Sequence, residues 1–329
     1  MSSAVEGLLA ELRSGGQVDS KGVFSLDLPR TLDKLSHFRL PSPYHYARNL
    51  VASAVAAGAT YVRFYSDADD TVLEHDGKPY PATQLRDLFG CLFEPESNLA
   101  VQATRELAIG LHEVRRARFH WARLLTWDGQ AGADLQMTER FLESKPRNRA
   151  PWPDRRMTCR LSIREKPGLR TLRKMAVKTV EGKTPEARIL DDACRLAPIP
   201  VFLNGQLLPL ALQRPMLSGA GVVHLFPQEP GPRVPELLRE MPADLRRETP
   251  DFFALIARTS VLPELTVVIH GIAFPGEGVD LGRPGVCAVV YSNTLVKDLS
   301  ETQVVRNQEF EAVVARLRQA VAERWPSVG

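Results

Sequence analysis

The stretch from residue 46 to residue 80 constrains the fold of this chain most, because it orders a helix, a strand, a turn and a second strand. Its first part repeats apolar residues at helical spacing, namely Ala47, Leu50, Val51, Ala54 and Val55. Gly58 predicts the end of that helix. Residues 61–65 and 71–74 predict two strands on either side of an Asp-rich turn. This order of elements favours an α+β fold.

Two short runs in this stretch carry a family pattern. Ala57-Gly58-Ala59-Thr60 follows the helix, and Asp76-Gly77 follows the second strand. With these runs the segment resembles the nucleotide-binding core of the GHKL ATPases, which include DNA gyrase B subunits, MutL mismatch-repair proteins and the ninety-kilodalton heat-shock chaperones. The resemblance implies a Bergerat-type mixed sheet covered by helices on one face, with ATP and magnesium as the ligands.

The catalytic positions of the family pattern ELxxNxxDAGAT are altered in this chain. The resemblance aligns the general-base Glu with Asn49, the magnesium-binding Asn with Ser53 and the Asp with Ala56. An amide cannot accept a proton from water at neutral pH, so Asn49 cannot act as the base. Ser53 offers magnesium a neutral oxygen on a shorter side chain. We therefore expect no catalytic residue, no hydrolysis, and weak or no ATP binding.

Three further positions are candidates for nucleotide contacts. In the family motif DxGxG the Asp binds adenine, and here either His75 or, with a shift of one residue, Asp76 takes its place before Gly77. Gly110 is the remaining glycine where the family has a glycine-rich lid. The alternative for residues 107–114 is an ordinary helix that packs its leucines inward.

The length of 329 residues suits two domains. We expect a nucleotide-binding-like domain over residues 1–183 and a smaller α+β domain, similar to a GHKL transducer domain, over residues 184–329. Thr184-Pro185-Glu186 predicts a helix start by capping. The run 195–208 resembles the hairpin that ends chaperone-type nucleotide domains, with a tight turn at Asn204-Gly205.

Other elements follow from periodicity. The expected helices cover residues 5–12, 84–93, 99–114, 185–196 and 307–325, and the expected strands cover 118–128, 157–165, 199–203, 264–274 and 286–291. Strands 118–128 and 157–165 are expected to pair, with residues 145–152 as a Pro-rich connection between them. Residues 33–38 precede two prolines that stiffen the entry to the first helix.

Positive charge is concentrated between Lys145 and Lys183, where thirteen basic residues face three acidic ones, although the net charge of the whole chain is only +3. Such a surface attracts acidic partners or polyanions. The candidate partner-binding residues are Arg155, Arg156, Arg173 and Lys174. The alternative is a solvated sheet edge that repels other strands. Trp152 is the only aromatic residue of the segment, which disfavours single-stranded nucleic acid.

Several classes of site lack their motif. The four cysteines form no CxxC pair and the seven histidines have no ligand spacing, so neither a structural metal nor a disulfide framework is expected. No GxSxG or Walker sequence occurs. No apolar run is long enough to span a bilayer, and cytoplasmic residence is the expectation.

Three hypotheses about function remain at this stage. The first is a degenerate GHKL-like protein that acts as a scaffold or regulatory protein-interaction module, and it is the one we favour. The second is an active ATPase whose catalytic acid comes from Glu74, Glu94, Glu96 or Glu106. The third is a nucleic-acid-associated protein that uses the basic segment 145–183.

Overall fold

The computed structural model describes residues 41–94, 101–117, 119–154, 156–211, 223–226, 246–248, 253–258, 264–276, 278–298 and 300–324. The chain divides into residues 1–37 and a compact unit of residues 38–329, to which all described residues belong. The helix expected at residues 5–12, the segment 33–38, Glu96 and Arg155 lie outside the described residues.

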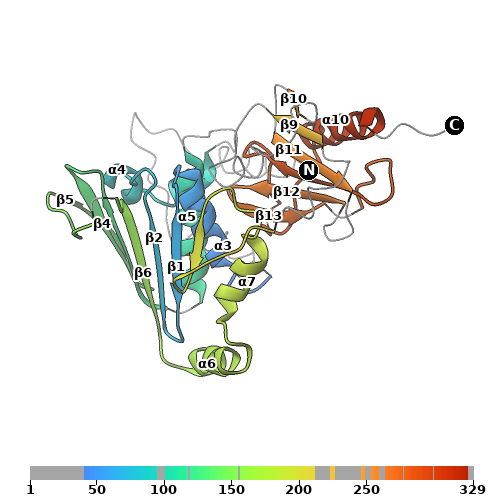
Figure 1. Cartoon of the computed structure of the whole chain (residues 1–329). Helices are drawn as coiled ribbons and strands as arrows, with labels where there is room; N and C mark the ends of the chain where they lie inside the picture. The colour runs from blue at the N-terminus through green and yellow to red at the C-terminus, as the bar shows by residue number, and fades with distance from the viewer. Residues whose placement is uncertain are drawn as a thin grey trace, which may run out of the picture. The chain divides into compact units, whose positions relative to one another are not determined.

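An eight-stranded mixed sheet forms the first half of this unit (Figure 1). Its strand order is β5-β4-β3-β6-β2-β1-β7-β8, and all neighbouring strands are antiparallel except the parallel pair β1 and β7. The bounds are β1 Val62–Ser66, β2 Asp70–His75, β3 Phe119–Trp127, β4 Gly132–Met137, β5 Leu142–Arg147, β6 Cys159–Glu165, β7 Val201–Leu203 and β8 Gln206–Leu207.

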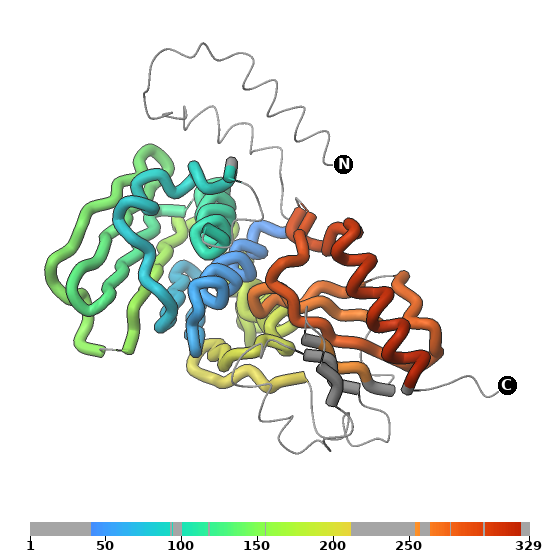
Figure 2. Tube along the Cα trace, turned by 90° about the horizontal axis from the view of Figure 1, so that it is seen from above, coloured from blue at the N-terminus to red at the C-terminus, as the bar shows by residue number. Residues whose placement is uncertain are grey.

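Helices α3 (Tyr46–Ala56), α5 (Gln102–Arg116) and α7 (Pro185–Ala193) lie on one face of the first sheet (Figures 1 and 2). Helix α3 packs against both α5 and α7 and carries buried Leu50, Val51 and Ala54 at the predicted spacing. Gly58 ends α3 in a left-handed conformation, with a φ of 76°. The short helices α4 (Ala82–Arg86) and η1 (Gly90–Phe93) precede α5, and α6 (Leu169–Glu181) connects β6 to α7.

A second sheet contains six strands in the order β10-β9-β11-β14-β12-β13. The bounds are β9 Val223–Phe226, β10 Arg246–Glu248, β11 Phe253–Arg258, β12 Leu265–Ile269, β13 Ile272–Pro275 and β14 Val286–Tyr291. Helix α10 (Gln308–Arg324) follows and buries one apolar face, which consists of Phe310, Val314, Leu317 and Val321. Two sheets with packed helices confirm the α+β class predicted from the sequence.

The sequence-based elements differ from the structure in several places. Residues 84–93 form α4 and η1 instead of one helix, and residues 264–274 form a hairpin that turns at His270-Gly271. The expected connection 145–152 begins inside β5, which tolerates Pro146 because it is the edge strand of its sheet. Helix α6 was not predicted. Strands β7 and β8 belong to the first sheet, and the domain boundary after residue 183 stays a prediction.

Candidate functional site

Asn49, the residue at the predicted general-base position, lies at the centre of a buried polar network. Its side-chain amide donates to Glu106 Oε2 at 3.0 Å and to Glu301 Oε2 at 3.3 Å. The ammonium of Lys297 forms ion pairs with both Glu106 and Glu301. We call these four residues the Asn49 cluster. It joins helices α3 and α5 to the segment that follows β14.

Lys297 and Glu301 are held by a tight loop. Lys297 forms an antiparallel bridge with Val304, and Asp298 accepts backbone hydrogen bonds from residues 302 and 303 at 2.8 and 2.9 Å. Glu301 has a φ of 56°, a left-handed conformation that is unusual for a residue with a Cβ. This loop places both side chains next to Asn49 and Glu106.

The two carboxylates of the cluster have opposite pKa shifts. Burial alone would raise the pKa of Glu106, but the charges of Lys297 and His270 and the hydrogen bonds from Lys297 and Asn49 together hold it below its usual value. Burial raises the pKa of Glu301 to about 7, because Lys297 compensates it only in part and Glu106 adds a like charge. Burial opposes the charge on Lys297 as well, yet the two carboxylates raise its pKa. Near neutral pH, Glu301 is therefore the member of the cluster that exchanges a proton.

A small pocket adjoins the cluster. It is lined by His45, Arg48, Asn49, Ala52, Ile272, Phe274, Lys297 and Glu301, and its cavity volume is about 10 Å³. The Arg48 guanidinium lies 4.9 Å from the centre of the Phe274 ring and closes one side. Small-molecule sites have volumes of about 300–1,000 Å³. This pocket therefore suits water or a small ion and is too small for a nucleotide.

Ser53, the candidate magnesium ligand, is already hydrogen-bonded within the protein. Its hydroxyl donates to the Ala103 carbonyl at 2.6 Å, so the Tyr80 hydroxyl, 2.5 Å away, is the donor in their mutual hydrogen bond. Ser53 is buried. Among the described residues, no group of three His, Cys, Asp or Glu side chains is placed to hold a metal ion.

Asp76 binds backbone groups of the chain itself. Its carboxylate accepts from the backbone N–H of Thr60 at 2.7 Å and of Tyr61 at 3.2 Å, and also from the Thr60 hydroxyl. The neighbouring His75 is buried, and burial lowers its pKa to about 4. Its neutral ring accepts from the Gly77 N–H at 3.1 Å. Both residues considered for adenine binding thus contact the backbone of the chain itself: Asp76 binds the segment after α3, and His75 binds the turn after β2.

The two candidate glycines make close packing contacts. A Cβ on Gly77 would come within 3.0 Å of the Ala57 oxygen and the Ala59 nitrogen. A Cβ on Gly110, in the middle of α5, would meet the Leu50 Cδ2 atom at 2.9 Å. Gly110 therefore lets α5 approach α3 closely, as in the alternative interpretation of residues 107–114 as a packed helix.

The basic segment separates into paired and exposed residues. Arg160 on β6 forms an ion pair with Glu74, and Arg164 pairs with Asp69 and Asp70 at the start of β2. Lys178 and Lys183 form ion pairs with Asp67 and Asp191. Arg156 and Arg173 are exposed. Trp152 donates its indole N–H to the Met157 carbonyl at 2.7 Å.

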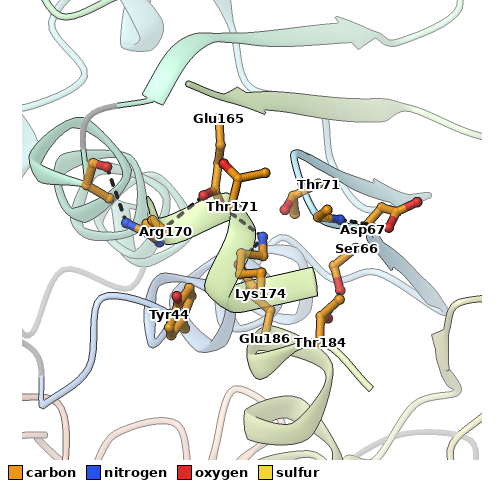
Figure 3. Close-up of polar contacts among 12 residues, drawn as sticks. Tyr44, Ser66, Asp67, Thr71, Glu165, Arg170, Thr171, Lys174, Thr184 and Glu186 are labelled. Atoms are coloured by element: carbon orange, nitrogen blue, oxygen red, sulfur yellow. Dashed lines mark hydrogen bonds and ion pairs between the residues drawn. The ribbon is translucent and has the colours of Figure 1, made fainter. Parts of the chain in front are cut away.

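Lys174 does not belong to the exposed surface, and its assignment to a partner-binding site was wrong. Its side chain is 0% exposed, and its ammonium lies 2.8 Å from one oxygen of Glu165 and 2.8 Å from one oxygen of Glu186 (Figure 3). Helix α6 turns this residue inward, where the two carboxylates raise its pKa against the opposing effect of burial.

The structure brings one of the suggested alternative acids to Asn49. Glu106 contacts the Asn49 amide directly, whereas Glu74 is paired with Arg160 on the first sheet at 3.5 Å, and Glu94 is exposed at the end of η1. Sequence reasoning did not find Lys297 and Glu301. They lie more than 190 residues beyond Glu106, and no local pattern marks them.

No family model matches this chain, and no curated protein matches its sequence. None of the helices in the described part of the chain is both long and apolar enough to cross a membrane.

Proposed function

We propose that this chain is a protein-interaction module, acting as a scaffold or regulator, built on the frame of a GHKL ATPase that no longer hydrolyses ATP. The observation that carries this proposal is the Asn49 cluster. An amide stands at the position of the general base, and its two hydrogen bonds go to Glu106 and Glu301 of the same chain.

Three features of the described residues support the loss of ATP chemistry. An amide cannot take the proton of an attacking water. Ser53 is buried and already hydrogen-bonded to Tyr80 and Ala103, which leaves one lone pair of its oxygen for a magnesium ion. The pocket beside Asn49, with a cavity volume of about 10 Å³, is far below the usual size of ligand sites.

A second candidate function is an ATPase that uses Glu106 as its base, which the contact between Glu106 and Asn49 favours. Two facts weigh against it. The ammonium of Lys297 pairs with Glu106 and holds its pKa below the usual range, which makes the carboxylate a weak base. The pairing also occupies one carboxylate oxygen while Asn49 occupies the other.

Thermal-shift titration with ATP and ADP in the presence of magnesium tests the binding part of the proposal. Stabilisation grows with ligand concentration over Kd, so a ligand that binds with a Kd of about 0.1 mM adds about 2.7 kcal/mol at about 10 mM. We expect no increase in Tm up to that concentration. A saturable increase would show that the chain binds nucleotide and would overturn this part.

Phosphate release from ATP tests the catalytic part. We expect none above background, and Asn49→Glu alone should not create activity because Ser53 and Ala56 are unchanged. Glu106→Gln and Glu143→Gln form a matched pair, since Glu143 is exposed on β5. Steady turnover that Glu106→Gln abolishes and Glu143→Gln preserves, with both variants folded by their melting curves, would establish the second candidate.

A further inference from the structure

Helix α6 exposes most of its apolar residues and buries one charged residue, Lys174. At about 100° per residue, one side of the helix carries five apolar residues, which we call the α6 stripe: Leu169, Leu172, Met175, Ala176 and Val180. Leu169 and Val180 are 87% and 84% exposed, and Leu172 and Met175 are more than half exposed. A surface helix of a globular protein normally has the opposite arrangement.

Ion pairs attach α6 to the protein from its other side (Figure 3). Lys174 contacts Glu165 on β6 and Glu186 on α7, and Arg170 Nε lies 3.3 Å from the second oxygen of Glu165. The Tyr46 hydroxyl at the start of α3 also donates to Glu186, at 3.0 Å. These contacts fix the rotation of α6 about its axis and hold the α6 stripe outward.

A contiguous apolar stripe on a fixed helix is a docking surface. Single exposed apolar residues are normal on protein surfaces, whereas contiguous exposed apolar patches mark binding sites. Because α6 is already ordered by Lys174, a partner loses no free energy in folding it. The remaining question is which chemistry covers the stripe.

The charge beside the α6 stripe indicates which chemistry the partner has. Arg173 is exposed beside the α6 stripe, between Leu172 and Ala176 in sequence and next to Leu169 around the helix. The other basic residues of α6, Arg170, Lys174 and Lys178, pair with Glu165, Glu186 and Asp67, so Arg173 supplies the positive charge beside the stripe. A second copy of α6 would place like charges together, which is unfavourable.

The arrangement of α6 also disfavours a lipid surface. Interfacial helices present Lys and Arg to the headgroups from their polar face and insert aromatic or leucine side chains. In α6 the polar face, with Arg170, Lys174 and Lys178, is turned to Glu165, Glu186 and Asp67 instead. No aromatic residue occurs between residues 169 and 181.

We propose that the α6 stripe binds an amphipathic helix of a protein partner, whose apolar side covers the stripe and whose acidic side chains pair with Arg173. An amphipathic partner helix would contact the stripe through apolar anchor residues at intervals of three and four. The inference rests on the proposed function as an interaction module and names the chemistry of the partner.

The test uses the full chain and three synthetic helical peptides as probes: an acidic amphipathic peptide of Leu and Glu, a basic one of Leu and Lys, and a scrambled acidic peptide without an apolar side. Fluorescence anisotropy measures each Kd. We expect binding of the acidic amphipathic peptide alone. The stripe variant Leu169→Gln/Leu172→Gln should weaken it at least about tenfold, because anchor residues carry most of the binding free energy.

Control variants separate the stripe from general effects. Leu207→Gln removes a comparably exposed leucine on β8, and Arg156→Glu reverses an exposed charge outside α6. Both should leave the Kd within about twofold of the unmodified chain, whereas Arg173→Glu should weaken binding about five- to tenfold and reduce its salt dependence. All substituted residues are exposed, so the melting curves should coincide.

Four outcomes would overturn the inference. These are no binding of the acidic amphipathic peptide up to about 1 mM, equal binding by the stripe variant, stripe-dependent sedimentation with phosphatidylserine vesicles, and a stripe-dependent dimer in analytical ultracentrifugation. The nucleotide experiments are independent of this result. Turnover of ATP together with stripe-dependent peptide binding would refute the proposed function and leave this inference standing.

Discussion

Replacement of Lys174 by Met tests how much the buried ion pairs of Lys174 stabilise the fold. The side chain of Lys174 is 0% exposed, and its ammonium holds two carboxylates that are themselves buried, Glu165 and Glu186. Met has a similar length and no charge, so the substitution removes the cation and leaves little cavity. Arg170 still contacts Glu165, but Glu186 retains only the Tyr46 hydroxyl.

The expected loss follows from the uncompensated charge. Removing one partner of a buried ion pair costs about 3–5 kcal/mol of unfolding free energy. We expect the upper part of that range, because two carboxylates lose their cation and Glu186 Oε2 has no hydrogen-bond partner even in the unmodified protein. Urea denaturation at pH 7 measures the difference, with an unchanged m-value as the sign that only stability has changed.

A control and a rescue make the measurement decisive. Lys183→Met removes an exposed cation that pairs with Asp191 at 2.8 Å, and it should cost less than about 1 kcal/mol. Lys174→Met/Glu186→Gln should recover part of the loss, because an amide replaces the orphaned charge. A cost of less than about 1 kcal/mol for Lys174→Met would refute the reasoning, since a buried cation between two carboxylates cannot be removed so cheaply.

Three further predictions concern the neighbourhood of Asn49. Gly110→Ala should lower the unfolding free energy by about 1–3 kcal/mol in urea denaturation, because the added methyl group would clash with Leu50. Gly129→Ala is the control for backbone strain, since a Cβ there meets no neighbouring atom within 4 Å but the residue has a φ of 106°. Asp76→Asn should destabilise by about 1–3 kcal/mol in urea denaturation, because Asp76 binds Thr60 and Tyr61; unchanged stability would contradict this. Glu301→Gln should flatten stability against pH between about 5 and 7. The folded protein holds the Glu301 proton more tightly than the unfolded chain, with a pKa of about 7 against 4.5, so stability falls as pH rises through that window. An unchanged slope in pH-dependent denaturation would show that Glu301 does not titrate there.

Local signals in the sequence were sufficient for the elements around the site. The helix start at Thr184 was predicted from its capping pattern, and its hydroxyl accepts from the Ala187 N–H at 3.3 Å. The turn at Asn204-Gly205 has both residues in the left-handed region, with φ values of 49° and 83°. These features depend on residues within one turn of each other, so one sequence contains all that determines them.

Prediction of the Asn49 cluster requires knowledge of contacts between residues that are far apart in the sequence. The sequence singled out Asn49 through its place in a family pattern, but the partners that give it meaning come from α5 and from the loop after β14. Lys297 and Glu301 are four residues apart in a stretch without helical periodicity. Their selection depends on tertiary packing, which neither spacing nor charge pattern determines.

In the segment that forms α6, the high positive charge obscured the helical periodicity of the apolar residues. Its apolar residues recur at intervals of three and four, and Gly182 ends it with a φ of 72°, as expected of a C-terminal glycine. Both signals were present in the sequence. The run of thirteen basic residues favoured a solvated surface, and burial of Lys174 between two carboxylates is the exception to that rule. Burying a lysine costs free energy unless it is paired, whereas burying the apolar side of α6 would hold the helix without this cost. In α6 the paired lysine nevertheless lies on the inner side, and the apolar side is exposed. That exchange is intelligible if the apolar side has another surface to bind.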